Sequence, residues 1–192
     1  MGLFEYLGVL ISVVMGLGIT HLLTGVSKVV QYRDTTRAYW VHLMWTANVL
    51  LYIVVIWWGM FWWNTLPEWN FFQFLFVTLY AIMLFLIAAM LYPWDFPHDF
   101  EFEDYFYRIR GWFFGLQVVA WLIDIRETTF KADMGLRELP ELYLLFVTTM
   151  LAFSMTAAVT RSRKFHAFYA IFWFLGVLAY LGSTTLARIA GY

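Results

Sequence analysis

Long apolar runs separated by short polar connections dominate the pattern along the chain. A helix needs about 20 mostly apolar residues to cross the hydrocarbon core of a bilayer. Five runs reach or approach that length with few ionisable residues: Leu7–Ser27, Tyr39–Trp63, Phe71–Tyr92, Leu142–Thr160 and Phe165–Ala187. This pattern predicts membrane-spanning helices.

A sixth stretch, Gly111–Ile123, is too short to cross a bilayer by itself. It becomes long enough if the helix begins near Tyr105, because Arg108 and Arg110 can extend to one headgroup layer while Asp124 lies near the other. We therefore expect a fourth span here. The alternative is a re-entrant or interfacial helix, which would leave five spans.

The runs together predict an all-α fold, a polytopic membrane helix bundle with about six transmembrane helices. One transmembrane domain would cover 1–192, with no separate soluble domain. The expected spans lie near 5–30, 37–63, 69–92, 105–125, 140–160 and 164–188. If both termini lie outside, eight of the twelve Lys and Arg residues fall on the inner side. Basic residues are enriched in cytoplasmic loops, so we expect this orientation.

The amino-acid composition also indicates that the protein lies in a membrane. The chain is 63% hydrophobic and only 13% charged, whereas a soluble domain carries about 25% charged residues. Such a chain would expose large apolar patches in water, so the predicted partner is the lipid bilayer. A net charge of -1 argues against a nucleic acid partner.

Several kinds of chemistry lack their usual residues. The chain contains no cysteine, which excludes thiolate metal sites, iron–sulfur clusters and cysteine nucleophiles. The sequence also shows no P-loop, no dinucleotide fingerprint and no H-E-x-x-H motif. We therefore expect neither an enzyme nor a bound cofactor or metal.

Small residues recur along the first span. Five of them follow one another at spacings of three and four and form one stripe: Ser12, Gly16, Thr20, Thr24 and Ser27. An adjacent face carries Gly18, His21 and Gly25. Small residues let helix backbones approach closely. We therefore expect Gly16, Gly18 and Gly25 to be helix-packing positions.

Polar side chains inside the spans are the main candidates for function, because they are costly in lipid unless they are paired or hydrated. On the fourth span, Arg110, Gln117 and Asp124 are seven residues apart and share one face. The candidates for a polar path through the membrane are His21, Gln117, Asp124, Thr20 and Thr24. The structural alternative is a set of interhelical hydrogen bonds and interface anchors.

Two more histidines, His42 and His166, fall toward the inner side at about the depth of His21. An imidazole at this depth suits a proton relay or a metal ligand, and two histidines could ligate a haem iron axially. A neutral histidine that bonds to a neighbouring helix is the structural alternative.

Four segments carry a resemblance: GLGITHLLTG at Gly16–Gly25, WVHLMW at Trp40–Trp45, DYFYRIRGWFFGL at Asp104–Leu116 and RSRKFHAF at Arg161–Phe168. Together they resemble small uncharacterised multi-spanning proteins encoded in many bacterial genomes. The resemblance implies a protein of the bacterial inner (plasma) membrane and transfers no functional residue.

The leading functional hypothesis is a small channel or transporter for an ion or a proton. A chain this short more often builds a path as a symmetric homo-oligomer. The alternatives are a non-catalytic membrane sensor, scaffold or accessory subunit, followed by a histidine-ligated haem or metal protein.

Overall fold

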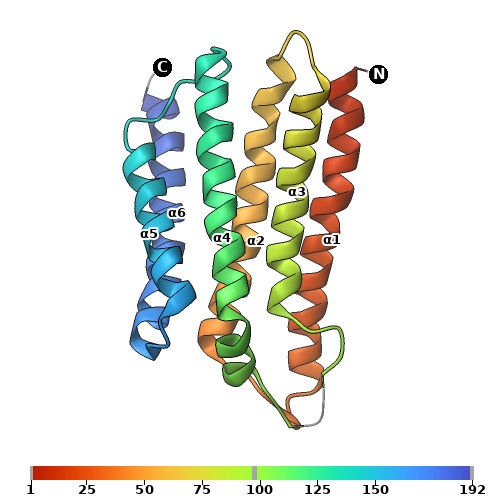
Figure 1. The fold of residues 1–192 in the computed structure, drawn as a ribbon, viewed down its shortest axis with the longest axis vertical. Helices are drawn as coiled ribbons and strands as arrows, with labels where there is room; N and C mark the ends of the chain where they lie inside the picture. Colours follow the sequence, from red (N-terminus) through yellow and green to blue (C-terminus); the bar gives the residue numbers. More distant parts are fainter. Residues whose placement is uncertain (1, 97–98, 191–192) are drawn as a thin grey trace.

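Six helices run alternately up and down and make up almost the whole protein (Figure 1). The computed structural model describes residues 2–96 and 99–190, with side chains up to residue 182. The helices are α1 (Leu3–Gln31), α2 (Trp40–Met60), α3 (Phe71–Leu91), α4 (Phe102–Asp133), α5 (Tyr143–Val159) and α6 (Arg163–Ala190). A 3-10 helix, η1 (Phe61–Thr65), continues α2. The prediction of an all-helical fold is confirmed.

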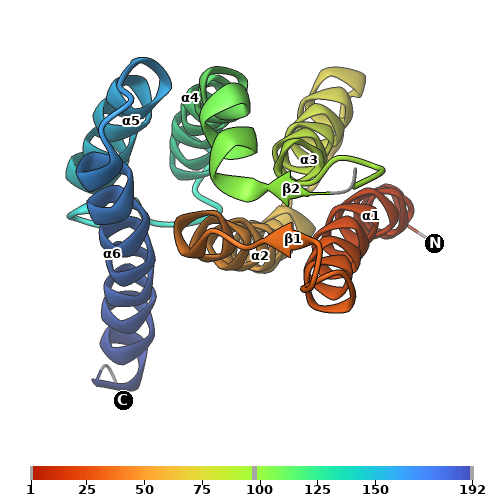
Figure 2. The same cartoon turned by 90° about the horizontal axis from the view of Figure 1, so that it is seen from below.

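The helices form two layers of three, with α1, α2 and α6 in one layer and α3, α4 and α5 in the other (Figure 2). In this arrangement α2 is the central helix and packs against α1, α3, α4 and α6. The start of α1 and the end of α6 lie at the same end of the bundle, which we call the terminal end (Figure 1). The opposite end, where α3 ends and α4 begins, is called the distal end.

A pair of two-residue strands joins two connections at the distal end. Strand β1 (Thr36–Arg37) follows α1, and strand β2 (Phe100–Glu101) directly precedes α4. The strands pair in parallel, with Thr36 opposite Phe100. Arg37 Nη1 also donates to Glu101 Oε1 at 3.1 Å. The connection from α1 to α2 is therefore fastened to the start of α4.

Local side-chain and backbone interactions define the ends of α3 and α4. At the start of α3, the Asn70 side chain accepts from the Gln73 backbone N–H at 3.0 Å, and the Gln73 side chain accepts from the Asn70 N–H at 2.9 Å. This reciprocal cap satisfies two of the free N–H groups of the first turn. After α4, Gly135 has a φ of 66°, a left-handed conformation that glycine adopts without steric cost and that ends helices.

Length and composition make four of the described helical segments able to cross a membrane: Leu3–Gln31, Trp40–Thr65, Phe71–Leu91 and Arg163–Gly182. The apolar helix α5 has only 17 residues, and α4 carries charged residues toward both of its ends. The count of about six spans is therefore not established by length and composition alone.

The buried face of α1 consists mainly of large apolar side chains, with glycines at two positions: Leu7, Ile11, Met15, Gly18, Leu22, Gly25 and Val29. A Cβ built at Gly25 would lie 2.2 Å from Cγ of Tyr92, so only glycine lets this ring lie against the helix. At Gly18 a Cβ would meet neighbours at ordinary distances of 3.5 Å or more.

The stripe of small residues on α1 does not face a neighbouring helix. A Cβ at Gly16 would meet nothing within 4 Å, so the close packing expected there does not occur within the described chain. Thr20 and Thr24 are exposed. The physical reason is that the large apolar residues of α1 fill the contacts with α2 and α3, which turns the small residues outward.

Candidate functional site

One face of α4 is polar and buried. Its five polar side chains are less than 9% exposed, although each would be solvated on a soluble surface: Gln117, Asp124, Glu127, Thr128 and Lys131. A buried polar group is costly unless it has hydrogen-bond partners. The partners of these residues therefore decide what the face can do.

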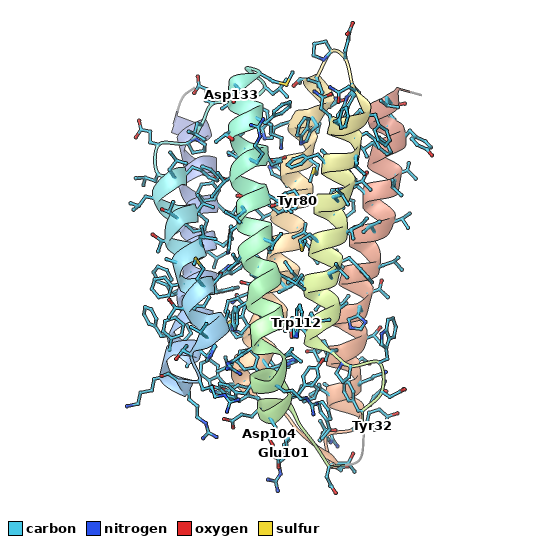
Figure 3. The ribbon with its side chains drawn as sticks, in the orientation of Figure 1. Tyr32, Tyr80, Glu101, Asp104, Trp112 and Asp133 are labelled. Carbon is cyan, nitrogen blue, oxygen red and sulfur yellow. The ribbon has the colours of Figure 1, made fainter. Side chains whose placement is uncertain are left out.

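Asp124 is held by tyrosines from two other helices. Tyr80 of α3 donates its hydroxyl to Asp124 Oδ1 at 2.9 Å, and Tyr143 at the start of α5 donates to Oδ2 at 2.8 Å. Tyr80 points into the bundle from the middle of α3 (Figure 3). The hydroxyl of Tyr52 on α2 lies 3.3 Å from that of Tyr80. Both carboxylate oxygens thus accept a hydroxyl hydrogen, and a third hydroxyl extends the chain toward α2.

One turn further along α4, Glu127 and Lys131 form a buried ion pair whose side chains are 8% and 2% exposed. The Trp63 indole N–H donates to Glu127 Oε1 at 2.8 Å, and Lys131 Nζ donates to the Gly59 carbonyl at 2.7 Å. The pair therefore joins α4 to the end of α2 and to η1. We refer to Asp124, Glu127 and Lys131, with Tyr80 and Tyr143, as the α4 polar cluster.

A cavity of about 70 Å³ lies beside the α4 polar cluster. Its lining includes all three ionisable residues of the cluster together with Arg137 and Tyr143. A space of roughly 10–15 Å³ on this measure holds one water molecule, so several waters fit. Two acidic and two basic side chains border the same small cavity, which can therefore hold water next to a buried carboxylate.

The geometry suits the binding of a proton better than the binding of a metal ion. A hard cation such as Ca²⁺ takes six to eight oxygen ligands, whereas both oxygens of Asp124 already face hydroxyl hydrogens of Tyr80 and Tyr143. Within the described residues, no group of three or more His, Cys, Asp or Glu side chains could hold a metal ion. A carboxylate beside a cavity that fits water and beside a lysine–glutamate pair can accept and release a proton.

Arg110 and Gln117, the other members of the seven-residue series, have different surroundings. Arg110 Nε donates to the Thr160 carbonyl at 3.1 Å, so this side chain ties α4 to the end of α5 near the distal end. Gln117 is buried, and its Oε1 has no hydrogen-bond partner among the described residues. The structure therefore does not join these two side chains to Asp124 by direct contacts.

The three histidines in the spans each bond to a carbonyl at the end of a helix. His42 Nε2 lies 2.7 Å from the Leu91 carbonyl, and His21 Nε2 lies 3.0 Å from the Tyr92 carbonyl. His166 Nε2 lies 3.0 Å from the Thr160 carbonyl at the end of α5. The last carbonyls of a helix have no partner within the helix. These histidines supply donors there and do not gather into one ligand set.

Replacing His42 with Leu is expected to lower the free energy of unfolding by about 1–3 kcal/mol, because the buried Leu91 carbonyl would lose its donor. His21→Leu is the matched control, since His21 is only partly buried and its loss lets lipid headgroups or water reach the Tyr92 carbonyl. Unfolding in mixed micelles, followed by circular dichroism, measures both. Equal losses would contradict a special role for the buried histidine.

Sequence reasoning found Asp124 and Gln117 but missed most of the partners in the cluster. One signal was present: the seven-residue spacing continues from Asp124 to Lys131, and Glu127 stands four residues before that lysine. Such i, i+4 pairs face each other on a helix. Tyr80 and Tyr143 have no comparable local signal, because they come from other helices.

Comparison with known proteins found no match to this chain among family models, curated proteins or solved structures. The functional argument therefore rests on the geometry of the described residues.

Proposed function

We propose that the protein is a multi-spanning membrane transport protein that conducts protons, with Asp124 as the group that binds the proton. The observation that carries the proposal is the α4 polar cluster: a buried carboxylate held by two hydroxyls, next to an ion pair and a cavity large enough for several waters. Ionisable residues are expensive within a membrane and commonly mark ion pathways or proton relays.

The position of Asp124 along the bundle supports a location inside the hydrocarbon region. Helix α3 has 21 residues and no charged residue or histidine, and its length of about 31 Å matches the bilayer core. Tyr80 is the tenth of these 21 residues. Because Tyr80 donates to Asp124, the carboxylate lies near the middle of an apolar helix rather than at the membrane surface.

The same contacts favour six spans. Helix α4 packs along both α3 and α5, so it crosses the membrane if α3 does, with Asp124, Glu127 and Lys131 turned inward. Helix α5 has 17 residues, the lower limit of the range of about 17–25 residues seen for spanning helices. Its contacts with α4 and α6 place it in the same bundle.

The distribution of basic residues supports an orientation with both termini outside, in a bacterial inner membrane. Eight of the twelve Lys and Arg residues lie in the distal-end connections or in the nearby helix turns: Lys28, Arg33, Arg37, Arg108, Arg110, Arg161, Arg163 and Lys164. Cytoplasmic loops carry such an excess. The distal end then faces the cytoplasm, and a homo-oligomer would repeat the α4 polar cluster once in each chain.

Replacing Asp124 with Asn tests the proposal. Proton transfer by a positioned side chain speeds a step by about 10²–10⁴-fold, so we expect Asp124→Asn to lower proton flux into liposomes at least about tenfold. A pH-sensitive dye inside the vesicles measures the flux. Asp133→Asn, the same change at an exposed position near the end of α4 (Figure 3), is expected to keep the flux of the unmodified protein.

Two results would overturn the proposal. One is a flux no greater than that of empty liposomes, and the other is an Asp124→Asn variant that conducts as well as Asp133→Asn. Gel filtration of each variant in detergent shows that the bundle remains folded. A non-conducting protein that copurifies with one partner at fixed stoichiometry would favour the scaffold or accessory-subunit alternative.

A further inference from the structure

Four buried polar atoms without hydrogen-bond partners gather where α2, α4 and α6 meet. They are Nε1 of Trp45, Oδ1 of Asn48, Oε1 of Gln117 and Nε1 of Trp173, as far as the described residues show. Their side chains are at most 4% exposed. An unsatisfied buried donor or acceptor costs about 1–3 kcal/mol, so four in one region require an explanation.

Contacts between α2 and α6 bring together three of the side chains that carry these atoms. The rings of Trp45 and Trp173 are 6.3 Å apart between centroids. The Asn48 Nδ2 group donates to the Ala170 carbonyl at 2.9 Å, which holds this amide against α6 three residues before Trp173. The remaining amide atom, Oδ1, is the acceptor without a partner.

Aromatic contacts on both sides of Gln117 place this amide at the same height in the bundle as Trp45 and Trp173. Phe114, one turn before it on α4, packs on Trp45 with ring centroids 5.0 Å apart. Trp121, one turn after it, lies 6.5 Å from Trp173. Residues three and four apart share a helix face. Gln117 therefore faces α2 and α6 between the two tryptophans.

The four atoms form a balanced set of two donors and two acceptors. An anion would satisfy only the two indole N–H groups, and a cation would satisfy only the two amide oxygens. Water both donates and accepts, and it commonly occupies buried sites where it makes about three hydrogen bonds to otherwise unsatisfied groups. The chemistry of the four atoms therefore selects water as the ligand.

We propose that ordered water binds among Trp45, Asn48, Gln117 and Trp173 and forms the distal half of a path to Asp124. This inference rests on the proposed function for its role, although the hydration itself does not. Toward the terminal end, Tyr52 follows Asn48 by one turn on α2, and its hydroxyl leads through Tyr80 to the carboxylate.

Toward the distal end the series continues with two more unpartnered acceptors. Nδ1 of His42 and Nδ1 of His166 are buried and have no partner among the described residues. His42 precedes Trp45 by three residues on α2, and His166 precedes Trp173 by seven residues on α6. Each histidine therefore shares a helix face with a tryptophan of the proposed water site.

Hydration of this site can be measured in the unmodified protein. In proteoliposomes, water-edited solid-state NMR of the indole N–H groups is expected to show magnetisation transfer from water to Trp45 and Trp173. The control is the backbone N–H of Leu84, which is fully buried and lies inside α3. A water signal at the Trp45 and Trp173 indoles as weak as that at the Leu84 N–H would overturn the water site, and this comparison needs no variant.

The role of the site in conduction is tested by Gln117→Leu, which keeps the size of the side chain but removes its polar atoms. We expect proton flux into liposomes to fall at least tenfold and the water signal at Trp45 and Trp173 to weaken. Gln31→Leu, at an exposed position on α1, is the matched control and keeps its flux.

The flux measurements on the two variants distinguish the proposed function of Asp124 from the proposed water path. If Asp124→Asn loses flux while Gln117→Leu keeps it, the path through this site is wrong and the function of Asp124 stands. If Asp124→Asn keeps flux, the proposed function is wrong, and the NMR measurement alone decides whether the site holds water.

Discussion

Replacing Lys131 with Met is expected to lower the free energy of unfolding by about 3–5 kcal/mol, the usual cost of removing one partner from a buried ion pair. The loss leaves Glu127 buried, with the Trp63 indole as its hydrogen-bond donor. It also removes the donor to the Gly59 carbonyl, which joins α4 to the end of α2. The expected cost therefore includes an unpaired charge and an unsatisfied backbone group.

Unfolding in mixed micelles titrated with SDS measures the effect of Lys131→Met. The control is Lys164→Met, which makes the same change at an exposed position near the start of α6 and should have little effect. The double variant Glu127→Gln with Lys131→Met should recover much of the stability, because it removes both charges. If the double variant is as unstable as Lys131→Met alone, an uncompensated Glu127 charge is not the cause.

Gly25→Ala is expected to destabilise the bundle by about 3 kcal/mol, at the upper end of the range for an added methyl group in a packed core. The new Cβ would lie 2.2 Å from Cγ of Tyr92. The ring cannot easily move away, because its hydroxyl lies 2.8 Å from Thr46 Oγ1 and it packs edge-to-face with His42. Both the overlap and the lost hydrogen bond contribute.

The same unfolding assay with Gly18→Ala provides the matched control on the same helix. A Cβ at Gly18 finds ordinary contact distances, and alanine favours a helix over glycine by about 0.5–1 kcal/mol. We therefore expect Gly18→Ala to be neutral or stabilising. Adding Tyr92→Ala to Gly25→Ala should cost much less than Tyr92→Ala costs alone. Additive losses would show that the clash with this ring is not responsible.

The apolar runs and the helices occupy the same stretches of the chain, but the helix that contains the span expected near 105–125 is longer than that span. Helix α4 continues to Asp133. A hydropathy argument stops at the first charges, whereas in the folded bundle Glu127 and Lys131 neutralise each other inside the protein. The pairing that allows the helix to continue involves Trp63 and Gly59, which are about seventy residues away in sequence.

The spacing of small and apolar residues along α1 could not show which face of the helix is buried in the bundle. In water, the apolar face of a helix is the buried one, but in lipid the exposed positions are as apolar as the buried ones. Exposed Leu17 and Leu23 illustrate this on α1. Spacing correctly grouped Thr20 and Thr24 on one face, but it carried no information on whether that face meets protein or lipid.

Only the part of the candidate site that lies on a single helix, α4, could be predicted from the sequence. Gln117 and Asp124 share a buried face of α4, as their spacing indicated. The side chains that define the chemistry of Asp124 come from α2, α3 and α5, and their meeting depends on how far each helix is shifted along its neighbours. A sequence of mostly apolar helices does not encode those shifts in any local pattern.

The short strand pair has a consequence for the position of the Asp124 carboxylate along the bundle. Strand β2 ends at Glu101 and α4 begins at the next residue, so the pairing with β1 sets both the starting height and the rotation of that helix. Asp124 follows Phe102 by 22 residues, a rise of about 33 Å. Inserting one residue just after the strand would turn the rest of α4 by about 100° and swing Asp124 away from its tyrosines. Two pairs of residues at the distal end thus set the position of a carboxylate at a distant point along α4.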